Sequence, residues 1–135
     1  CSSDLMGGDG VCSEQMPTLA GEGLIDDVVV CAEPGGIEDT QKKIMEDFRI
    51  AFRKKFNGNV QIYAPYAYDA TMLMITAMQK AGSADPAKYL PVMAASKYQG
   101  VTGLIEFDGK GDVKNSALTL YTFRNKQRIQ LAVVR

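Results

Sequence analysis

Apolar residues recur at steps of three and four positions along the middle of the chain, a spacing typical of amphipathic helices. The clearest stripe lies within Glu38–Phe56 and consists of Ile44, Phe48, Ala51, Phe52 and Phe56. Acidic residues near the start of this segment and basic residues at its end complement the helix dipole. Gly58 follows and offers a left-handed C-terminal cap. The pattern predicts a long helix over 38–56.

Two further helices are predicted after the first. The segment Tyr66–Ala81 carries a second apolar stripe, and Gly82 directly follows it. Asp85-Pro86 then combines an N-cap residue with a proline at the first helical position. This pair predicts a third, shorter helix that reaches about Ala95.

The remaining apolar segments are short, as strands are. The expected strands are the run Val28–Cys31 within Leu24–Ala32, then Val101–Phe107, Ala117–Phe123 and Ile129–Val134, and Val60–Tyr63 is either a short strand or an extended entry to the next helix. One face of the fourth is expected to carry Leu118, Leu120 and Thr122. Arg124–Gln127 is a polar hairpin loop, and residues 6–23 predict a loop with one helical turn near Ser13–Leu19. This order of elements predicts an α/β domain with a β-rich tail.

Composition narrows the class of function. The chain has 135 residues, 46% of them hydrophobic, which suits a globular domain. It contains no histidine, which excludes a Ser-His-Asp or Cys-His nucleophile pair and a histidine-ligated metal. With 15 basic and 16 acidic residues it lacks the charge that marks nucleic-acid binding. No metal or cofactor is expected.

The N-terminus and the cysteines raise separate questions. Residues 1–5, Cys-Ser-Ser-Asp-Leu, match the translation of a common sequencing adapter, so we expect them to be non-native and the chain to be a fragment. Cys12 and Cys31 are then the remaining cysteines. They could be two small buried residues, or they could form a disulfide, which would suit an oxidising compartment.

Three segments could carry chemistry. Gly8-Asp9-Gly10 places a carboxylate between residues that let a ligand approach the backbone, although an ordinary turn has the same composition. Tyr63 lies where a predicted strand leads into a helix, a place where α/β folds often bind ligands, but it could equally pack the helix start. Asp108–Asp112 is predicted to be a plain turn, because Lys110 occupies the position where a calcium loop needs an oxygen ligand.

The order of several motifs resembles the periplasmic leucine/isoleucine/valine-binding proteins, the substrate-binding components of branched-chain amino acid ABC transporters. The motifs are Met6-Gly7-Gly8-Asp9-Gly10-Val11, Leu19-Ala20-Gly21-Glu22-Gly23-Leu24, Tyr66-Ala67-Tyr68-Asp69-Ala70, Asp85-Pro86-Ala87-Lys88-Tyr89-Leu90 and the run from Gly100 to Asp112. Their order and spacing carry the resemblance, which covers residues 6–135. It implies the type I periplasmic-binding fold, with two Rossmann-like lobes and the ligand between them.

The resemblance also implies that this chain is the C-terminal part of a longer protein. On this mapping, residues 6–32 end lobe two, residues 33–112 form the C-terminal part of lobe one, and residues 113–135 add a final hairpin to lobe two. The chain would cross between lobes near Cys31–Pro34 and again near Asp112–Ser116. The first half of the ligand site, which holds the ligand carboxylate, would be missing.

The resemblance further implies which residues bind and how. Asp9, flanked by Gly8 and Gly10, would pair with the ammonium group of an amino acid, and Tyr63 would be an aromatic cleft residue. The family more often has glutamate where Asp9 stands, so the ligand could differ. The full-length protein would be a periplasmic monomer that closes around its ligand and delivers it to a membrane permease.

Two other functions remain open from the sequence. A stand-alone Rossmann-like enzyme or regulatory domain would need a phosphate-binding glycine loop or a nucleophile with a base, and GxGxxG is not satisfied. A structural α/β domain without a ligand would need none of these.

Overall fold

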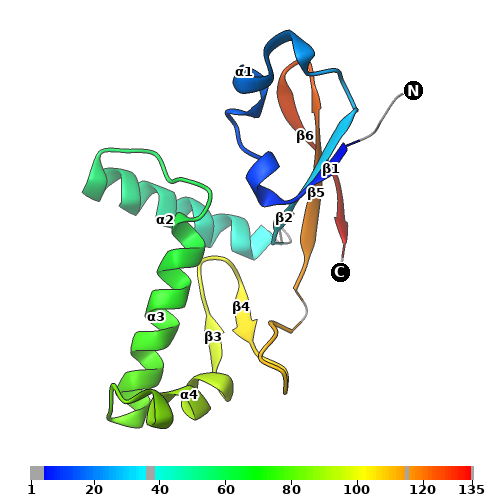
Figure 1. Ribbon diagram of the computed structural model, residues 1–135. Helices are drawn as coiled ribbons and strands as arrows, with labels where there is room; N and C mark the ends of the chain where they lie inside the picture. The colour runs from blue at the N-terminus through cyan, green and yellow to red at the C-terminus, as the bar shows by residue number, and fades with distance from the viewer. Residues whose placement is uncertain (1–4, 36–38, 115, 135) are drawn as a thin grey trace. The chain divides into compact units, whose positions relative to one another are not determined.

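The computed structural model describes residues 5–35, 39–114 and 116–134, which fall into two units (Figure 1). Unit 1 consists of Cys1–Gly36 with Asn115–Arg135, and unit 2 of Ile37–Lys114. The sequence places the corresponding boundaries after residues 32 and 112. Cys1 and the other residues at 1–4 lie outside the described part, as does Glu38, the expected first residue of the long helix.

Four strands form the sheet of unit 1, in the spatial order β1-β2-β5-β6. They are β1 (Leu5–Gly7), β2 (Val29–Pro34), β5 (Leu118–Arg124) and β6 (Gln127–Val134). β1 runs parallel to β2, whereas β2 and β5, and β5 and β6, pair antiparallel. Since β2 and β5 are neighbours in the sheet, the whole of unit 2 is inserted between two paired strands.

β2 begins one residue later than the predicted run Val28–Cys31 and extends to Pro34. Asp27 has a φ of 63°, and its N–H donates to the carbonyl of Phe123 at 3.1 Å. A strand cannot run through a residue in the left-handed region, so the regular part of the strand starts only at Val29.

The predicted hairpin of β5 and β6 is confirmed. Its turn residues Asn125 and Lys126 have φ values of 49° and 60°. A type I′ turn has positive φ at both of these central positions. Turns of this type match the twist of the strands that they join, and asparagine tolerates the left-handed conformation that the first position requires. The polar turn therefore determines the register of the hairpin.

Burial does not follow the expected face of β5. Leu118, Leu120 and Thr122 alternate along the strand, whose pairing with β2 runs without a register shift. The register shift between Leu120 and Tyr121 is in the pairing with β6, where Leu131 is the extra residue. Leu118 is exposed, and the buried side chains of this strand are Thr119, Thr122 and Phe123.

The segment between β1 and β2 is not a plain loop. It contains the 3-10 turn η1 (Asp9–Val11), the short helix α1 (Met16–Ala20), which falls largely within the predicted helical turn, and a second 3-10 turn η2 (Gly21–Gly23). Residue 7 must be glycine, because a Cβ there would lie 2.6 Å from Cγ2 of Val11. The buried core under these turns consists of Cys12, Val29, Cys31 and Phe123.

Unit 2 contains three helices and a two-stranded sheet. The elements are α2 (Asp39–Phe56), α3 (Ala64–Ala81), α4 (Pro86–Ala94), β3 (Lys97–Gln99) and β4 (Leu104–Glu106). The sequence predicts all three helices, but only the second strand of the antiparallel pair, as the longer segment Val101–Phe107. The rings of Phe48 and Tyr68, tilted at 53° with centroids 5.2 Å apart, join α2 to α3.

At the helix ends, local prediction succeeds for α3 and α4 and fails for α2. Gly82 ends α3 with a φ of 61°, and Oδ1 of Asp85 accepts the N–H of Ala87 at 3.0 Å as the N-cap of α4. The predicted cap at Gly58 is wrong, because Asn57 takes the left-handed conformation instead, with φ 50°. Asparagine is the residue other than glycine that most readily does so.

The predicted strand Val60–Tyr63 does not form. A turn in which the N–H of Ala64 donates to the carbonyl of Gln61 at 3.0 Å leads directly into α3. Pro65 lies in the first turn of this helix. Proline fits there because the first helical N–H groups need no partner within the helix.

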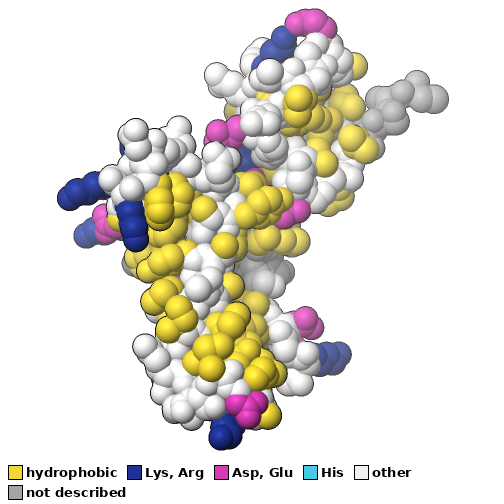
Figure 2. All heavy atoms as spheres, turned by 60° about the vertical axis from the view of Figure 1, so that its left-hand side comes forward, with side chains coloured by type: hydrophobic (Ala, Val, Ile, Leu, Met, Phe, Trp, Pro, Cys, Tyr) yellow, Lys and Arg dark blue, Asp and Glu magenta, His cyan; other side chains and the backbone are white. Residues whose placement is uncertain are grey.

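Unit 2 has a small core and a large apolar surface. Its buried hydrophobic side chains are Leu73, Ala77 and Val101, together with buried Pro65. Figure 2 shows hydrophobic side chains spread over the face of this unit that it draws. The exposed ones include Ile50, Phe56, Tyr68, Met74, Ile75 and Leu90. Among the described residues of these helices, more large hydrophobic side chains are exposed than buried.

Candidate functional site

The Asp9 loop, Gly8–Val11, presents a carboxylate at the surface of unit 1. Gly8 is extended before the 3-10 turn, and the N–H of Gly10 donates to Oδ1 of Asp9 at 2.9 Å. Gly8 and Gly10 are exposed, and a Cβ on either would meet nothing within 4 Å. Because an ionised carboxylate can accept several hydrogen bonds, Asp9 keeps acceptor capacity for a positively charged donor.

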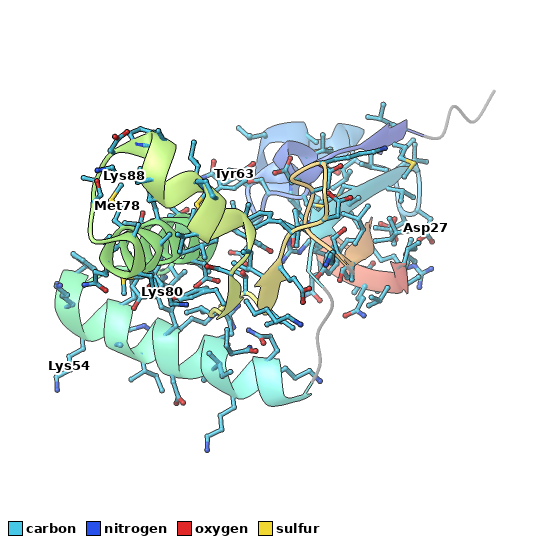
Figure 3. All side chains as sticks on the ribbon, turned by 90° about the horizontal axis from the view of Figure 1, so that it is seen from below. Asp27, Lys54, Tyr63, Met78, Lys80 and Lys88 are labelled. Atoms are coloured by element: carbon cyan, nitrogen blue, oxygen red, sulfur yellow. A yellow bond between two sulfur atoms is a disulfide. The ribbon has the colours of Figure 1, made fainter. Side chains whose placement is uncertain are left out.

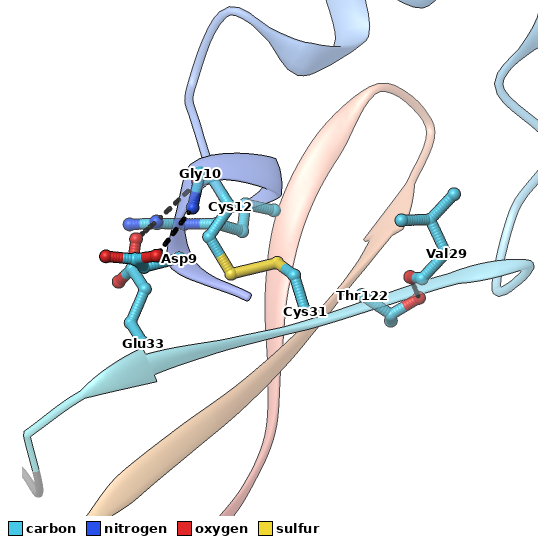
Figure 4. Close-up of a disulfide and its surroundings, with 8 residues drawn as sticks. Asp9, Gly10, Cys12, Val29, Cys31, Glu33 and Thr122 are labelled. Carbon is cyan, nitrogen blue, oxygen red and sulfur yellow. Dashed lines mark hydrogen bonds and ion pairs between the residues drawn. A yellow bond between two sulfur atoms is a disulfide. The ribbon is translucent and has the colours of Figure 1, made fainter. Parts of the chain in front are cut away.

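A disulfide between Cys12 and Cys31 anchors this loop to the sheet (Figure 4). Both cysteines are fully buried, with Cα atoms 5.4 Å apart. Cys12 directly follows η1, and Cys31 lies in β2. Of the two alternatives from the sequence, two separate buried cysteines or a disulfide, the structure has the disulfide.

Arg128 on β6 reinforces the same anchor. Its Nη1 donates to the carbonyl of Cys12 at 2.8 Å and pairs with Oε1 of Glu33 on β2. Its guanidinium also lies over the ring of Tyr121, 4.5 Å from the centroid. Sequence analysis missed Arg128 and Glu33, because only the strand register brings residues 95 positions apart together.

The electrostatic environment of the loop is acidic. Burial raises the pKa of Glu33, and the opposing effect of the Arg128 cation is smaller. The charges of Asp9 and Glu14 raise the pKa of Glu33 further. Asp9 and Glu14 therefore lie close enough to Glu33 to interact with it electrostatically.

Tyr63 belongs to unit 2, whereas Asp9, Gly8 and Gly10 belong to unit 1. Tyr63 lies directly before α3, as Figure 3 shows, and its side chain is 52% exposed. The structure therefore brings together the three loop residues, and Tyr63 stays a separate candidate on the other unit.

The remaining acidic motif is a turn, as predicted. Oδ1 of Asp108 accepts the N–H groups of Lys110 and Asp112 at 2.8 and 3.0 Å. Among the described residues, no group of three or more acidic, cysteine or histidine side chains could hold a metal ion. Within the same part of the chain, no helix is long and apolar enough to cross a membrane.

Comparison with solved structures defines the class of protein. The leucine-binding protein LivK of Thermotoga maritima superposes with a TM-score of 0.75 at 20% identity, over 96% of this chain and 36% of that one. The branched-chain amino acid transporter substrate-binding protein LivJ of Streptococcus pneumoniae, solved with isoleucine, gives 0.70 at 22% identity, over 95% and 35%. The fold is that of the type I periplasmic-binding proteins, as the sequence predicts.

Sequence comparison then identifies the family. Residues 6–128 match the family described as periplasmic binding protein, and the chain belongs to it. It is 32% identical over 117 residues to the leucine-, isoleucine-, valine-, threonine- and alanine-binding protein of Pseudomonas aeruginosa. That match covers 86% of this chain and 30% of the relative, so the chain spans about a third of the length of such proteins.

Proposed function

We propose that this chain forms part of the substrate-binding component of an ABC transporter, in which Asp9 binds the ammonium group of an amino acid. The observation that carries the proposal is the Asp9 loop itself, a partly exposed carboxylate between two open glycines and anchored by a disulfide. The similarity to an aliphatic amino acid-binding protein supports the same ligand class.

Binding would proceed without covalent chemistry. Unit 1 would supply lobe two with its acidic loop, and unit 2 would supply part of lobe one, including Tyr63. The ligand carboxylate would be held by the part of lobe one that this chain lacks. Closure of the lobes around the ligand in the periplasm would present a monomeric complex to the membrane permease.

A hybrid protein tests this proposal. Residues 6–135 would replace the matching segment of the Pseudomonas aeruginosa relative, and isothermal titration calorimetry would measure leucine binding. We expect a dissociation constant of about 1 µM or tighter. Replacing the acceptor in Asp9→Ala should weaken binding by about 10- to 100-fold, because a charge-assisted hydrogen bond is lost.

Two further variants control for charge and shape. Asp9→Asn keeps the size of the side chain but not its charge, and should bind almost as weakly as Asp9→Ala. Asp112→Ala removes an exposed carboxylate from unit 2 and should leave affinity unchanged. Tight binding that survives Asp9→Ala would remove the role given to Asp9, and a folded hybrid that binds no aliphatic amino acid would refute the proposed ligand class.

A further inference from the structure

Arg128 joins three elements of unit 1 beside the Asp9 loop. Its side chain starts on β6, donates to the carbonyl at the end of η1, pairs with Glu33 on β2 and covers Tyr121 on β5. Its side chain is only 27% exposed. Arg128 therefore holds the chain that carries Asp9 against three strands of the sheet.

Cys12 is the residue through which this contact reaches Asp9. Its N–H donates to the carbonyl of Asp9 at 3.0 Å, its sulfur is bonded to Cys31, and its own carbonyl accepts from Arg128. The disulfide restrains the side chain of Cys12, and the hydrogen bond from Arg128 restrains its carbonyl. The N–H of the same residue donates to the carbonyl of Asp9, so both restraints reach the η1 turn through Cys12.

We propose that Arg128 is a positioning residue for Asp9, which sets the orientation of the η1 turn so that the carboxylate is presented to the ligand. This inference rests on the proposed function of Asp9. Among the described residues, the ion-pair partner of Arg128 is Glu33 rather than Asp9. Arg128 thus balances the carboxylate of Glu33 and leaves that of Asp9 for the ligand.

Arginine is suited to this task for a geometric reason. Its planar guanidinium can donate to two acceptors while its face covers an aromatic ring, whereas lysine is a point charge on a flexible stem. Arg128→Lys should therefore keep the attraction to Glu33 but lose the restraint on the Cys12 carbonyl. Arg128→Met removes both.

The first measurement uses the 135-residue chain and needs no ligand. Amide hydrogen exchange would be followed at Val11 and Cys12, whose N–H groups close the η1 turn. Arg128→Met should speed their exchange about tenfold relative to the amides of β5. Arg124→Met is the control, because Arg124, one register position nearer the hairpin turn, makes a more exposed ion pair with Asp27, 2.8 Å from Nε to Oδ1, and this pair involves no residue of η1. It should leave η1 unchanged.

The second measurement is leucine affinity in the hybrid protein. We expect Arg128→Met to weaken binding by about tenfold, Arg128→Lys to restore little of it, and Arg124→Met to have no effect. Equal acceleration of all amides, or full rescue by Arg128→Lys, would overturn the positioning role. If the unmodified hybrid binds no leucine, the proposed function fails, while the exchange measurement still decides whether Arg128 orders the turn.

Discussion

Asp69 leaves no room for a side chain at Gly100: a Cβ at that position would lie 2.5 Å from Cγ of the carboxylate. Asp69 is buried on α3, where its oxygens accept the N–H groups of Val101 and Thr102 at 2.8 and 2.7 Å and the Thr102 hydroxyl at 2.6 Å. The loop between β3 and β4 is therefore built around one buried carboxylate.

Gly100→Ala should destabilise unit 2 by about 1–3 kcal/mol, because the added methyl group must displace backbone that the carboxylate holds. Urea unfolding followed by far-ultraviolet circular dichroism would measure the change. Gly8→Ala is the matched control, since a Cβ there meets nothing, and should change the unfolding free energy by less than about 0.5 kcal/mol. Equal effects of the two substitutions would contradict the packing argument.

Removing the disulfide should destabilise unit 1 by about 3 kcal/mol, because Cys12 and Cys31 are 19 residues apart and the cross-link restricts the unfolded chain. The paired variant Cys12→Ala with Cys31→Ala would be compared with the parent by urea unfolding. Adding a reductant should destabilise the parent alone. A parent that is indifferent to reductant would show that this cross-link contributes little.

The pKa of Glu33 should respond to its neighbours in a definite order. Asp9→Asn should lower it, because a like charge is removed, and Arg128→Met should raise it further, because the compensating cation is lost. Side-chain carboxyl chemical shifts measured across a pH titration would test both. Glu14→Gln also removes a like charge and should likewise lower the pKa of Glu33.

The same shift predicts how stability depends on pH. Because the folded pKa of Glu33 lies above its ordinary value of 4.5, the protonated form is favoured in the folded state. Its contribution to stability should be fully present below pH 4.5 and be lost as pH rises through the folded pKa. As pH rises from 4.5 through the folded pKa of Glu33, the parent should therefore lose stability relative to Glu33→Gln. A difference that does not vary with pH would contradict this reasoning.

The 135-residue chain by itself should bind aliphatic amino acids weakly or not at all. It carries the acidic loop for the ammonium group, but the proposed partners of the ligand carboxylate lie in the remainder of the longer relatives. Calorimetry with leucine, beside the hybrid protein as a positive control, would show the contrast. Robust binding by the chain alone would mean that the site is complete within these residues.

Local patterns predict the helices well and the site poorly. The stripe containing Phe48 and Phe52 and the Asp85-Pro86 pair act through neighbouring residues, so the sequence is sufficient to place α2 and the start of α4. The choice of Asn57 over Gly58 as a cap and the turn before Ala64 depend on differences too small for propensity to decide.

Contacts between distant residues account for what the sequence could not predict. Arg128 reaches Glu33 and Cys12 only through the register of three strands, one of which contains a bulge. Asp69 meets Val101 across 32 positions. The carboxylate of Asp9 was predicted as a candidate because its glycine neighbours are adjacent in sequence, whereas the side chains that hold its loop are not.

The insertion of unit 2 between β2 and β5 has a consequence for the order of folding. The N–H of Gly35 bonds the carbonyl of Ala117 at 2.7 Å, so the two strands meet only after the intervening residues have been synthesised. Long-range pairing of this kind forms late, since a large loop must close first. Cys12 and Cys31 are both synthesised well before β5. The disulfide can therefore form and attach the η1 turn to β2 before β2 pairs with β5.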